Sequence, residues 1–347
     1  MAEKLPFQKP VFISGEYGYH TFRIPAVIVS KEGTILAFCE GRRTSGSDHG
    51  DLDIVLRRSC DNGKTWTNPI IVYGEAGNIT IGNPCPVVDQ STGTIWLPFC
   101  RDNNDVLITK SNDDGITWSE PIDITKDVKK SDWGWYATGP GVGIQIKYGP
   151  HKGRMVIPCD HREKMDDKWF MFSHVFYSDD AGKTWQLGGS VAIHTDECQL
   201  VELTDGRLLI NMRNYWERTG GEAKKGDMRA LSWSDDGGET WSELEFDEQL
   251  IEPICQASFI RYDKKLLLFS NPADKSNRIN MTVRISCDEG ESWPLSKSLY
   301  AGPSAYSCLT VLPDMSIGCL YECGEKSAYQ TITFANFDLD WFSDKKE

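Results

Sequence analysis

Residues 59–66 read Ser59-Cys60-Asp61-Asn62-Gly63-Lys64-Thr65-Trp66, which is an S-x-D-x-G-x-T-W motif. The motif returns as Ser111–Trp118, Ser178–Trp185 and Ser234–Trp241, and, with Ser292 in place of Thr, as Ser286–Trp293. The starts of the copies are separated by 52, 67, 56 and 52 residues. A repeat of this period is typical of solenoids, propellers and similar arrays.

Each copy has the local chemistry of a tight turn. An Asp bonds backbone amides ahead of it, and a Gly two residues later tolerates a positive φ. The Trp needs a buried surface to pack against, and β-rich runs precede the copies, as at Asp53–Arg58 and Met281–Ile285. The motif therefore predicts β-hairpin turns, each held to its own sheet by its Trp.

The chain length fits a closed ring of such units. At 347 residues and a mean spacing of about 57, the chain holds roughly six repeats. We expect an all-β, six-bladed β-propeller of four-stranded antiparallel sheets, and one domain over residues 1–347. Propeller closure predicts that Leu309–Tyr321 and Gln330–Phe337 pair beside Pro10–Ser14, so that no edge stays exposed.

Composition excludes several classes of protein. The net charge of −14 argues against nucleic acid and anionic membranes as partners. The sequence contains no run of 18 apolar residues, so we expect no transmembrane helix. Met1–Pro6 lacks the apolar core of a signal peptide. The 11 cysteines, an odd count without a C-x-x-C pair, favour reduced thiols over disulfides or structural zinc. We expect a cytoplasmic protein with no metal or cofactor, although a secreted protein after signal removal has the same features.

The segment before the first repeat carries a second motif, Phe22-Arg23-Ile24-Pro25. An Arg in an apolar strand is costly to bury without a partner, and Pro25 indicates the start or edge of a strand. Residues 41–51 form a polar, Gly-rich loop of the kind that often carries function. Together with Glu40-Gly41-Arg42, Asp48 and the repeats, which are Asp-boxes, this segment closely resembles the exo-α-sialidases, or neuraminidases. The resemblance runs from about Gly18 to about Phe334.

The resemblance implies three arginines that grip the carboxylate of a sialic acid. Guanidinium forks match carboxylate geometry. Arg23 corresponds to the first, Arg213, in Leu209–Asn214, to the second, and Arg278 to the third. Arg284 competes with Arg278, but its strand leads directly into the last Asp-box.

The resemblance also implies a tyrosine nucleophile. A carboxylate would be repelled by the substrate's own carboxylate, and sialidases are exceptions to the two-carboxylate pattern of glycosidases. Tyr306 matches the nucleophile segment and Glu197 the base, which a Tyr of ordinary pKa needs to react near neutrality. The alternative for Tyr306 is a core residue with a satisfied hydroxyl.

Asp48 corresponds to the general acid, and in a second step to the general base. Its pKa would have to rise in the closed site. Asp51 and Asp53 are nearby rivals, with a structural role expected for Asp53. Arg42 corresponds to a further arginine that contacts the sugar's polar substituents or its carboxylate.

Glu322 corresponds to the acid that pairs with Arg23 and orients it, the alternative being an exposed charge at the end of a strand.

Possible pocket-wall residues lie in the middle repeats. Trp133 and Trp135 have the aromatic density of a wall for an N-acyl group, although the core of a blade is an equal alternative. Asn83 is expected to bring an amide or backbone contact. Asp160 and Arg162 stand where vertebrate relatives carry tyrosines against the glycerol chain, so preferences on that side stay open.

These residues predict a retaining exo-α-sialidase that acts through a covalent sialyl-tyrosine on sialylated glycoproteins, glycolipids or oligosaccharides. Transfer of the sugar to another acceptor, or release of an anhydro product, is a variant of the same chemistry. The alternatives from other classes are a catalytically silent sialoglycan-binding propeller and a protein-interaction scaffold. Turnover of a fluorogenic sialoside would distinguish the enzyme from both.

Overall fold

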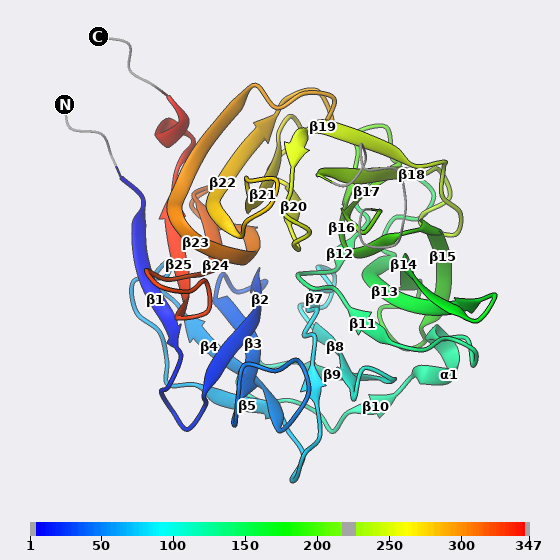
Figure 1. Ribbon diagram of the computed structural model, residues 1–347, viewed down its shortest axis with the longest axis horizontal. Helices are drawn as coiled ribbons and strands as arrows, with labels where there is room; N and C mark the ends of the chain where they lie inside the picture. The colour runs from blue at the N-terminus through cyan, green and yellow to red at the C-terminus, as the bar shows by residue number, and fades with distance from the viewer. Residues whose placement is uncertain (1–4, 217–226, 344–347) are drawn as a thin grey trace.

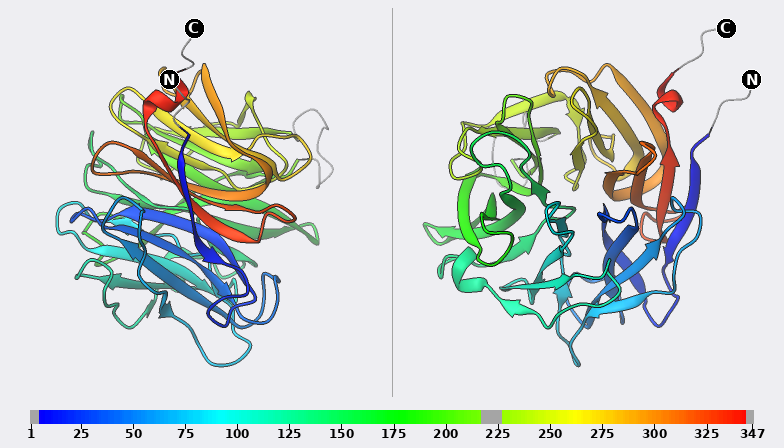
Figure 2. Two further views of the ribbon diagram at one scale, coloured as in Figure 1. Left: turned by 90° about the vertical axis from the view of Figure 1, so that its left-hand side faces the viewer. Right: turned by 180° about the vertical axis from the view of Figure 1, so that it is seen from behind.

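The structure is a computed structural model that describes residues 5–216 and 227–343. Sheets stand around a central axis in a propeller-like ring, and the first and last strands lie side by side at its rim (Figures 1 and 2). Within the described residues the fold is all-β apart from the helix α1 (Thr125–Val128) and the 3-10 turn η2 (Leu339–Phe342). Residues 1–4, on which the expectation about a signal peptide partly depends, lie outside this description.

The described strands form five hydrogen-bonded sheets whose strand pairs are antiparallel. The first comprises β2 (Thr21–Val29), β3 (Ile35–Arg42), β4 (Leu52–Ser59) and β5 (Ile70–Tyr73). The second comprises β6 (Ile81–Gly82), β7 (Val87–Val88), β8 (Ile95–Arg101), β9 (Asp105–Ser111) and β10 (Ile122–Asp123). The third comprises β11 (Tyr136–Thr138), β12 (Ile144–Gln145), β13 (Met155–Met165), β14 (Lys168–Ser178) and β15 (Gln186–Ile193). The fourth comprises β16 (Thr195–Glu202), β17 (Leu208–Asn214), β18 (Met228–Ser234) and β19 (Glu245–Ile251).

The fifth sheet has seven strands because one strand is long enough to serve two sets of neighbours. It comprises β20 (Ser258–Arg261), β21 (Leu267–Pro272), β22 (Ile279–Ser286), β23 (Leu295–Val311), β24 (Ile317–Cys323), β25 (Thr331–Phe337) and β1 (Phe7–Ile13). The first half of β23 pairs with β22, with Leu295 opposite Ile285, and the second half pairs with β24, with Val311 opposite Ile317.

The chain ends close the ring as the sequence predicts. β25 pairs with β24 on one side and with β1 on the other, where Pro10 lies opposite Thr333 and Phe12 opposite Ile332. Because β25 lies between β24 and β1, the last strand of the chain is not a free edge.

The Asp-boxes form turns after β4, β9, β14, β18 and β22, and their hydrogen bonds repeat from copy to copy. In the first, Ser59 Oγ donates to Asp61 Oδ1 over 2.8 Å, and the Thr65 amide donates to the same oxygen over 2.8 Å. Gly63 has a φ of 83°, and a Cβ there would lie 2.3 Å from the Phe334 ring. Only glycine therefore fits this position without displacing its neighbour.

The prediction that each box is held to its own sheet by its Trp is wrong for the first two copies. Trp66 packs on Phe334 of β25, with ring centroids 5.3 Å apart, and Trp118 packs on Phe38 of β3 at 5.8 Å. Both partners belong to the preceding sheet in the ring. Trp185 packs on both sides, at 6.1 Å from Trp96 of the preceding sheet and at 5.4 Å from Phe176 of its own sheet. Trp293 does follow the prediction and packs within its own sheet. Several of the boxes thus join neighbouring sheets, because the Trp in the turn reaches the preceding sheet.

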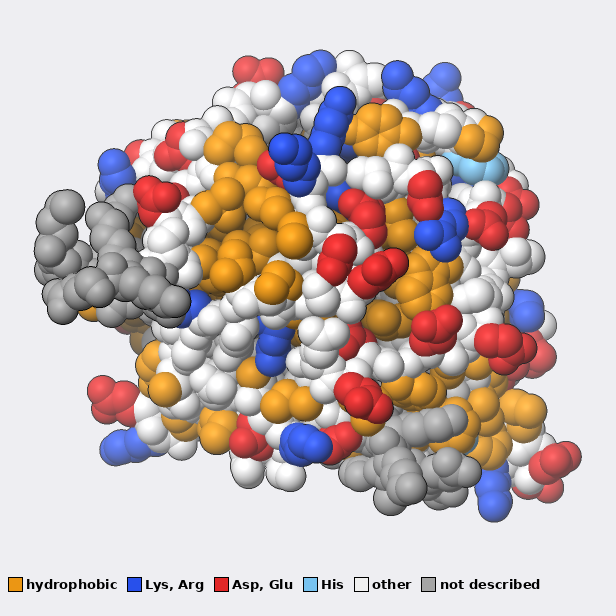
Figure 3. All heavy atoms as spheres, turned by 90° about the horizontal axis from the view of Figure 1, so that it is seen from above, with side chains coloured by type: hydrophobic (Ala, Val, Ile, Leu, Met, Phe, Trp, Pro, Cys, Tyr) orange, Lys and Arg blue, Asp and Glu red, His pale blue; other side chains and the backbone are white. Residues whose placement is uncertain are grey.

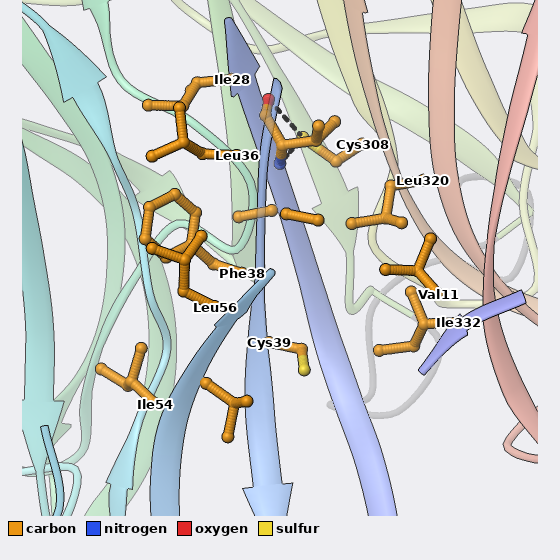
Figure 4. Packing of buried hydrophobic residues seen from close by; sticks show 14 of the residues in the cluster. Val11, Ile28, Leu36, Phe38, Cys39, Ile54, Leu56, Cys308, Leu320 and Ile332 are labelled. Carbon is orange, nitrogen blue, oxygen red and sulfur yellow. Dashed lines mark hydrogen bonds between the residues drawn. The ribbon is translucent and has the colours of Figure 1, made fainter. Parts of the chain in front are cut away.

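Buried apolar side chains fill the space between neighbouring sheets. In Figure 4, Leu36, Phe38 and Leu56 lie on one side of the β2–β3 ribbon, while Leu320 and Ile332 lie on the other. The sheet of β2 to β5 is thus covered on both faces, which explains why its strands read as continuous hydrophobic runs.

The cysteines are free thiols, all buried except Cys60 and Cys287. Burial raises the pKa of Cys100 to about 12, so this thiol stays protonated and unreactive at neutral pH. Figure 3 shows one edge of the ring, where Asp and Glu side chains are spread among hydrophobic patches rather than gathered in one field. No helix in the described part of the chain has the length and apolarity needed to cross a membrane.

Candidate active site

A cavity of about 320 Å³ gathers eleven of the thirteen predicted site residues. They are Arg23, Arg42, Asp48, Asn83, Trp135, Asp160, Arg162, Glu197, Arg213, Arg278 and Tyr306. These positions span nearly the whole chain, and only the closed ring brings them to one place. A larger hollow of about 970 Å³ lies between β18–β19 and the last Asp-box, but it contains none of the predicted site residues.

Bulges in the inner strands direct the side chains of the site residues toward the cavity. The pairing of β2 with β3 shifts between Arg23 and Ala26, and Ile24 has a φ of 59°. Pairing also shifts next to Glu197 in β16 and next to Tyr306 in β23. A positive φ at a β-branched residue is strained and persists only when its surroundings hold it. Here the Ile24 amide donates to Glu322 Oε1 over 3.0 Å, which holds the bulge and directs Arg23 toward the cavity.

Tyr306 and Glu197 are in direct contact, because the Tyr306 hydroxyl donates a short hydrogen bond to Glu197 Oε1. Arg213 Nη1 lies 2.6 Å from Glu197 Oε2 and donates to the Tyr306 hydroxyl over 3.1 Å. Burial and the Glu197 charge raise the pKa of Tyr306 well above its ordinary value, while Arg213, Arg278 and Arg23 oppose the rise. The Tyr306 hydroxyl is therefore neutral, and the carboxylate of Glu197 already accepts a hydrogen bond from its proton.

The three predicted arginines surround that tyrosine. Arg23 Cζ lies 5.1 Å from the centroid of the Tyr306 ring, and Arg278 Cζ lies 5.5 Å from it. Arg213 reaches its hydroxyl, as described above. Arg284, the competitor for the third place, instead donates to Asn271 Oδ1 over 2.9 Å and is not part of the cavity.

Glu322 is fully buried, so the alternative of an exposed charge is wrong. Arg23 Nε donates to Glu322 Oε1 over 2.7 Å, and the Tyr306 amide donates to Glu322 Oε2 over 3.1 Å. One carboxylate therefore fixes both Arg23 and the backbone of Tyr306, although it does not itself line the cavity.

Asp48 lies on the loop between β3 and β4, with its side chain 67% exposed. Its Oδ1 is 2.8 Å from Arg42 Nη1 and 3.9 Å from Arg23 Nη1. Burial raises the pKa of Asp48, but the charges of Arg42 and Arg23 outweigh it and hold that pKa below its ordinary value. In this structure Asp48 thus does not have the raised pKa that a general acid requires. The rivals lie elsewhere, because Asp51 and Asp53 both pair with Arg43.

Four of the five residues predicted for the pocket wall line the cavity, and Trp133 does not. Trp135, Asn83, Asp160 and Arg162 line the cavity, and Arg162 Cζ lies 5.3 Å from the centroid of the Trp135 ring. Trp133 instead belongs to the core, stacked on His161 with centroids 3.4 Å apart. Residues two apart in an ideal strand point to the same side, but Trp133 and Trp135 precede the strand β11 in a segment without regular structure. Spacing alone therefore did not reveal which indole faces the site.

Several site residues were not singled out from the sequence. Tyr329 lies beneath Arg23, with its ring centroid 4.2 Å from Arg23 Cζ, and accepts a hydrogen bond from Arg278 Nη1 over 3.1 Å. Glu40, which stands inside the Glu40-Gly41-Arg42 motif, pairs with Arg42 at 2.7 Å and accepts from the Asn83 amide at 2.9 Å. Asp196 precedes Glu197 and lies against Arg213. Only the position of Glu40 within a motif offered a signal.

The comparisons with known proteins agree with this geometry. Residues 33–320 match the BNR repeat-like domain family. The sialidase of Micromonospora viridifaciens is 35% identical over 374 aligned residues, which cover 98% of this chain and 55% of that protein. The exo-alpha-sialidase of Aspergillus fumigatus is 31% identical, over 96% of this chain and 87% of that protein. The solved Hadza microbial sialidase Hz136 superposes with a TM-score of 0.84 at 30% identity, over 97% of this chain and 69% of that one.

The chain spans little more than half the length of the Micromonospora relative. The match to the Aspergillus enzyme extends over most of both proteins. This chain belongs to the sialidase family.

Proposed function

We propose that the protein is an exo-α-sialidase that releases terminal α-ketosidically linked sialic acids from glycoproteins, glycolipids or oligosaccharides. The observation that carries the proposal is the arrangement around one phenol. Glu197 accepts the Tyr306 proton, Arg213 contacts both, and Arg23 and Arg278 lie within 5.5 Å of the ring centroid. This set matches a substrate with a carboxylate on the carbon that is attacked.

The arginines bind the substrate carboxylate. Each guanidinium presents paired N–H donors to a planar anion, and a charge-assisted hydrogen bond is stronger than a neutral one. Arg23 and Arg213 are buried, so little water competes for their donors. Glu322 and Tyr329 hold two of these guanidinium groups in place before the substrate arrives.

Tyr306 attacks the anomeric carbon. Its Oη–C2 bond forms as the bond from C2 to the leaving oxygen breaks, Glu197 takes the phenol proton, and Asp48 protonates the leaving oxygen. In the second step Asp48 takes a proton from water, the water oxygen bonds to C2, and Tyr306 leaves and recovers its proton from Glu197. Two inversions give net retention.

Asp48 must be protonated when it donates. Its pKa is lowered because Arg42 and Arg23 stabilise the carboxylate. A substrate carboxylate on Arg23 neutralises part of that positive charge and displaces water from the cavity. Both changes raise the pKa of Asp48, so substrate binding itself prepares the acid.

The remaining wall residues bind the sugar's substituents. Arg42 binds polar groups of the sugar ring, Trp135 lies beside the N-acyl group, and Asn83, Asp160 and Arg162 offer polar contacts.

We also propose that the propeller has six four-stranded blades, with β23 shared between the last two, and that residues 1–347 act as one domain. A cytoplasmic location is part of the same proposal.

A fluorogenic sialoside tests the activity. We expect turnover by the native protein and loss of turnover, with binding of sialic acid retained, in Tyr306→Phe. Retained binding without turnover in the native protein would favour a silent sialoglycan-binding propeller. Analysis of the released sugar separates hydrolysis from transfer or anhydro-product formation, since hydrolysis gives free sialic acid alone.

A further inference from the structure

Three carboxyl groups share one arginine at the floor of the cavity. Arg213 Nη1 lies 2.6 Å from Glu197 Oε2, and its Nε lies 3.4 Å from Asp196 Oδ2. Asp160, on β13 of the neighbouring sheet, lies against Asp196, and both residues line the cavity. Three ionised carboxylates beside one guanidinium leave an excess negative charge where the substrate's own carboxylate must bind.

One oxygen of the buried Asp160 carboxyl group lacks a hydrogen-bond donor within the part of the chain that the structure describes. It is 1% exposed, and its Oδ1 has no hydrogen-bond partner among the described residues. The Ser173 hydroxyl, on the paired strand β14, donates instead to the Asp196 carbonyl oxygen. The Tyr136 hydroxyl of β11 donates to the Val128 carbonyl over 3.3 Å. A buried carboxylate in these surroundings is costly unless it keeps a proton.

The other charged and titratable groups around Asp160 do not change this balance. The groups that face it are Tyr136 from β11, Cys100 from β8, Asp196, Glu197 and Cys198 from β16, and Arg213 from β17. Arg213, the one cation among them, is engaged by Glu197 and Asp196. Arg162, two residues along β13, instead lies over Trp135 and donates through Nε to Met171 Sδ over 3.0 Å.

We propose that Asp160 and Asp196 share one proton at neutral pH, and that Asp160 is a positioning residue that keeps excess negative charge away from Glu197 and Tyr306. A proton held between two adjacent carboxyl groups forms a hydrogen bond that satisfies both groups, and it removes one negative charge. The inference rests on the proposed function for its effect on catalysis, but the shared proton itself does not.

Electrostatics support the same arrangement. Burial, followed by the charges of Asp196 and Glu197, raises the pKa of Asp160 well above its ordinary value, against the opposing effect of Arg213. Burial also raises the pKa of Asp196, to about 6. The two groups titrate as a pair, so the proton belongs to both.

The pair gives the enzyme an alkaline limit. When the pH rises above the range in which the pair holds its proton, a new negative charge appears beside Glu197 and Arg213. That charge opposes binding of the substrate carboxylate, so KM rises and kcat/KM falls.

Asp160→Asn tests this, because the amide keeps a donor to Asp196 and cannot titrate. We expect the alkaline decline of kcat/KM to move up by about one pH unit or more. Asp51→Asn is the control, since it removes a carboxylate that pairs with Arg43 and does not line the cavity. An alkaline decline that is the same in native protein, Asp160→Asn and Asp51→Asn would overturn the role.

Infrared spectroscopy tests the proton without any turnover. At neutral pH the native protein should show the C=O stretch of a protonated carboxylic acid that is absent from Asp160→Asn and present in Asp51→Asn. Identical spectra in this region would overturn the proposal. If the band is present but no sialoside is cleaved, the shared proton stands and the proposed function fails.

Discussion

Arg23 and Glu322 lie 299 residues apart in the chain and form a buried ion pair in which Arg23 Nε donates to Glu322 Oε1 over 2.7 Å. The same carboxylate accepts the amides of Ile24 and Tyr306. The pair thus ties the first inner strand of the ring to its last sheet and holds a substrate-binding cation beside the proposed nucleophile.

Glu322→Ala is expected to destabilise the fold and weaken substrate binding together. It leaves Arg23 buried without its charge partner, a change that typically costs about 3–5 kcal/mol. Urea unfolding and KM for a fluorogenic sialoside measure the two effects. Asp167→Asn is the control, because this 94% exposed partner of Lys164 should change stability by less than about 1 kcal/mol. Similar unfolding midpoints for both variants would contradict the importance of the buried pair.

Arg278→Ala is expected to lower kcat/KM by roughly 30-fold, mainly through KM, because a hydrogen bond to a charged group contributes about 2 kcal/mol. The side chain is held by Tyr329 and by the Ile254 carbonyl, so it is in place before the substrate binds. Arg207→Ala, which removes a half-exposed arginine paired with Asp205, should leave kcat/KM unchanged. Equal effects of the two substitutions would show that Arg278 does not contact the substrate.

Asp48→Asn is expected to affect substrates according to their leaving group. A general acid contributes about 10²- to 10⁴-fold when the leaving oxygen is a poor one, as in a sialylated sugar. A phenol leaves without help, so a fluorogenic aryl sialoside should lose much less activity. Rates for both substrates, with Asp51→Asn as the control, check this. The same loss with both substrates would argue against acid catalysis by Asp48.

The Asp-boxes predict a dependence of stability on acid pH. Hydrogen bonds from the Thr65 side chain and backbone lower the pKa of Asp61 from 3.8 to about 2. A lowered pKa means that the stabilisation is present above the ordinary value and is lost as the pH falls from 3.8 toward 2. Asp61→Ala should therefore lower the urea midpoint at neutral pH and show a shallower fall over that acid range. An unchanged fall in Asp61→Ala would contradict this assignment.

Much of the site was predictable because its chemistry stands in short motifs. Arg23, Glu197 and Tyr306 each lie in a recognisable segment, and the repeats predicted a ring that would bring them together. The packing of Trp66 and Trp118 on preceding sheets was not predictable in the same way. A repeat gives the period of a ring, but it does not give the side of the turn that meets a neighbour.

Residues that act through contacts distant in sequence were also missed. Tyr329 supports Arg23 and Arg278, yet it lies in a turn with no motif of its own. Asp160 was placed on the wall, but its contact with Asp196 depends on how β13 and β16 pack. Trp133 and Trp135 carried the same sequence signal, and only the irregular backbone of residues 133–135 distinguishes a core indole from one that lines the cavity.

The most direct test of the mechanism is the identification of the covalent intermediate. A fluorinated sialic acid with a good leaving group slows the second step, so intact-mass measurement and peptide mapping can locate the sugar. We predict one sialyl group per chain, attached to Tyr306 and absent from Tyr306→Phe. Attachment to another residue, or a Tyr306→Phe variant that turns over sialosides at the native rate, would contradict the account.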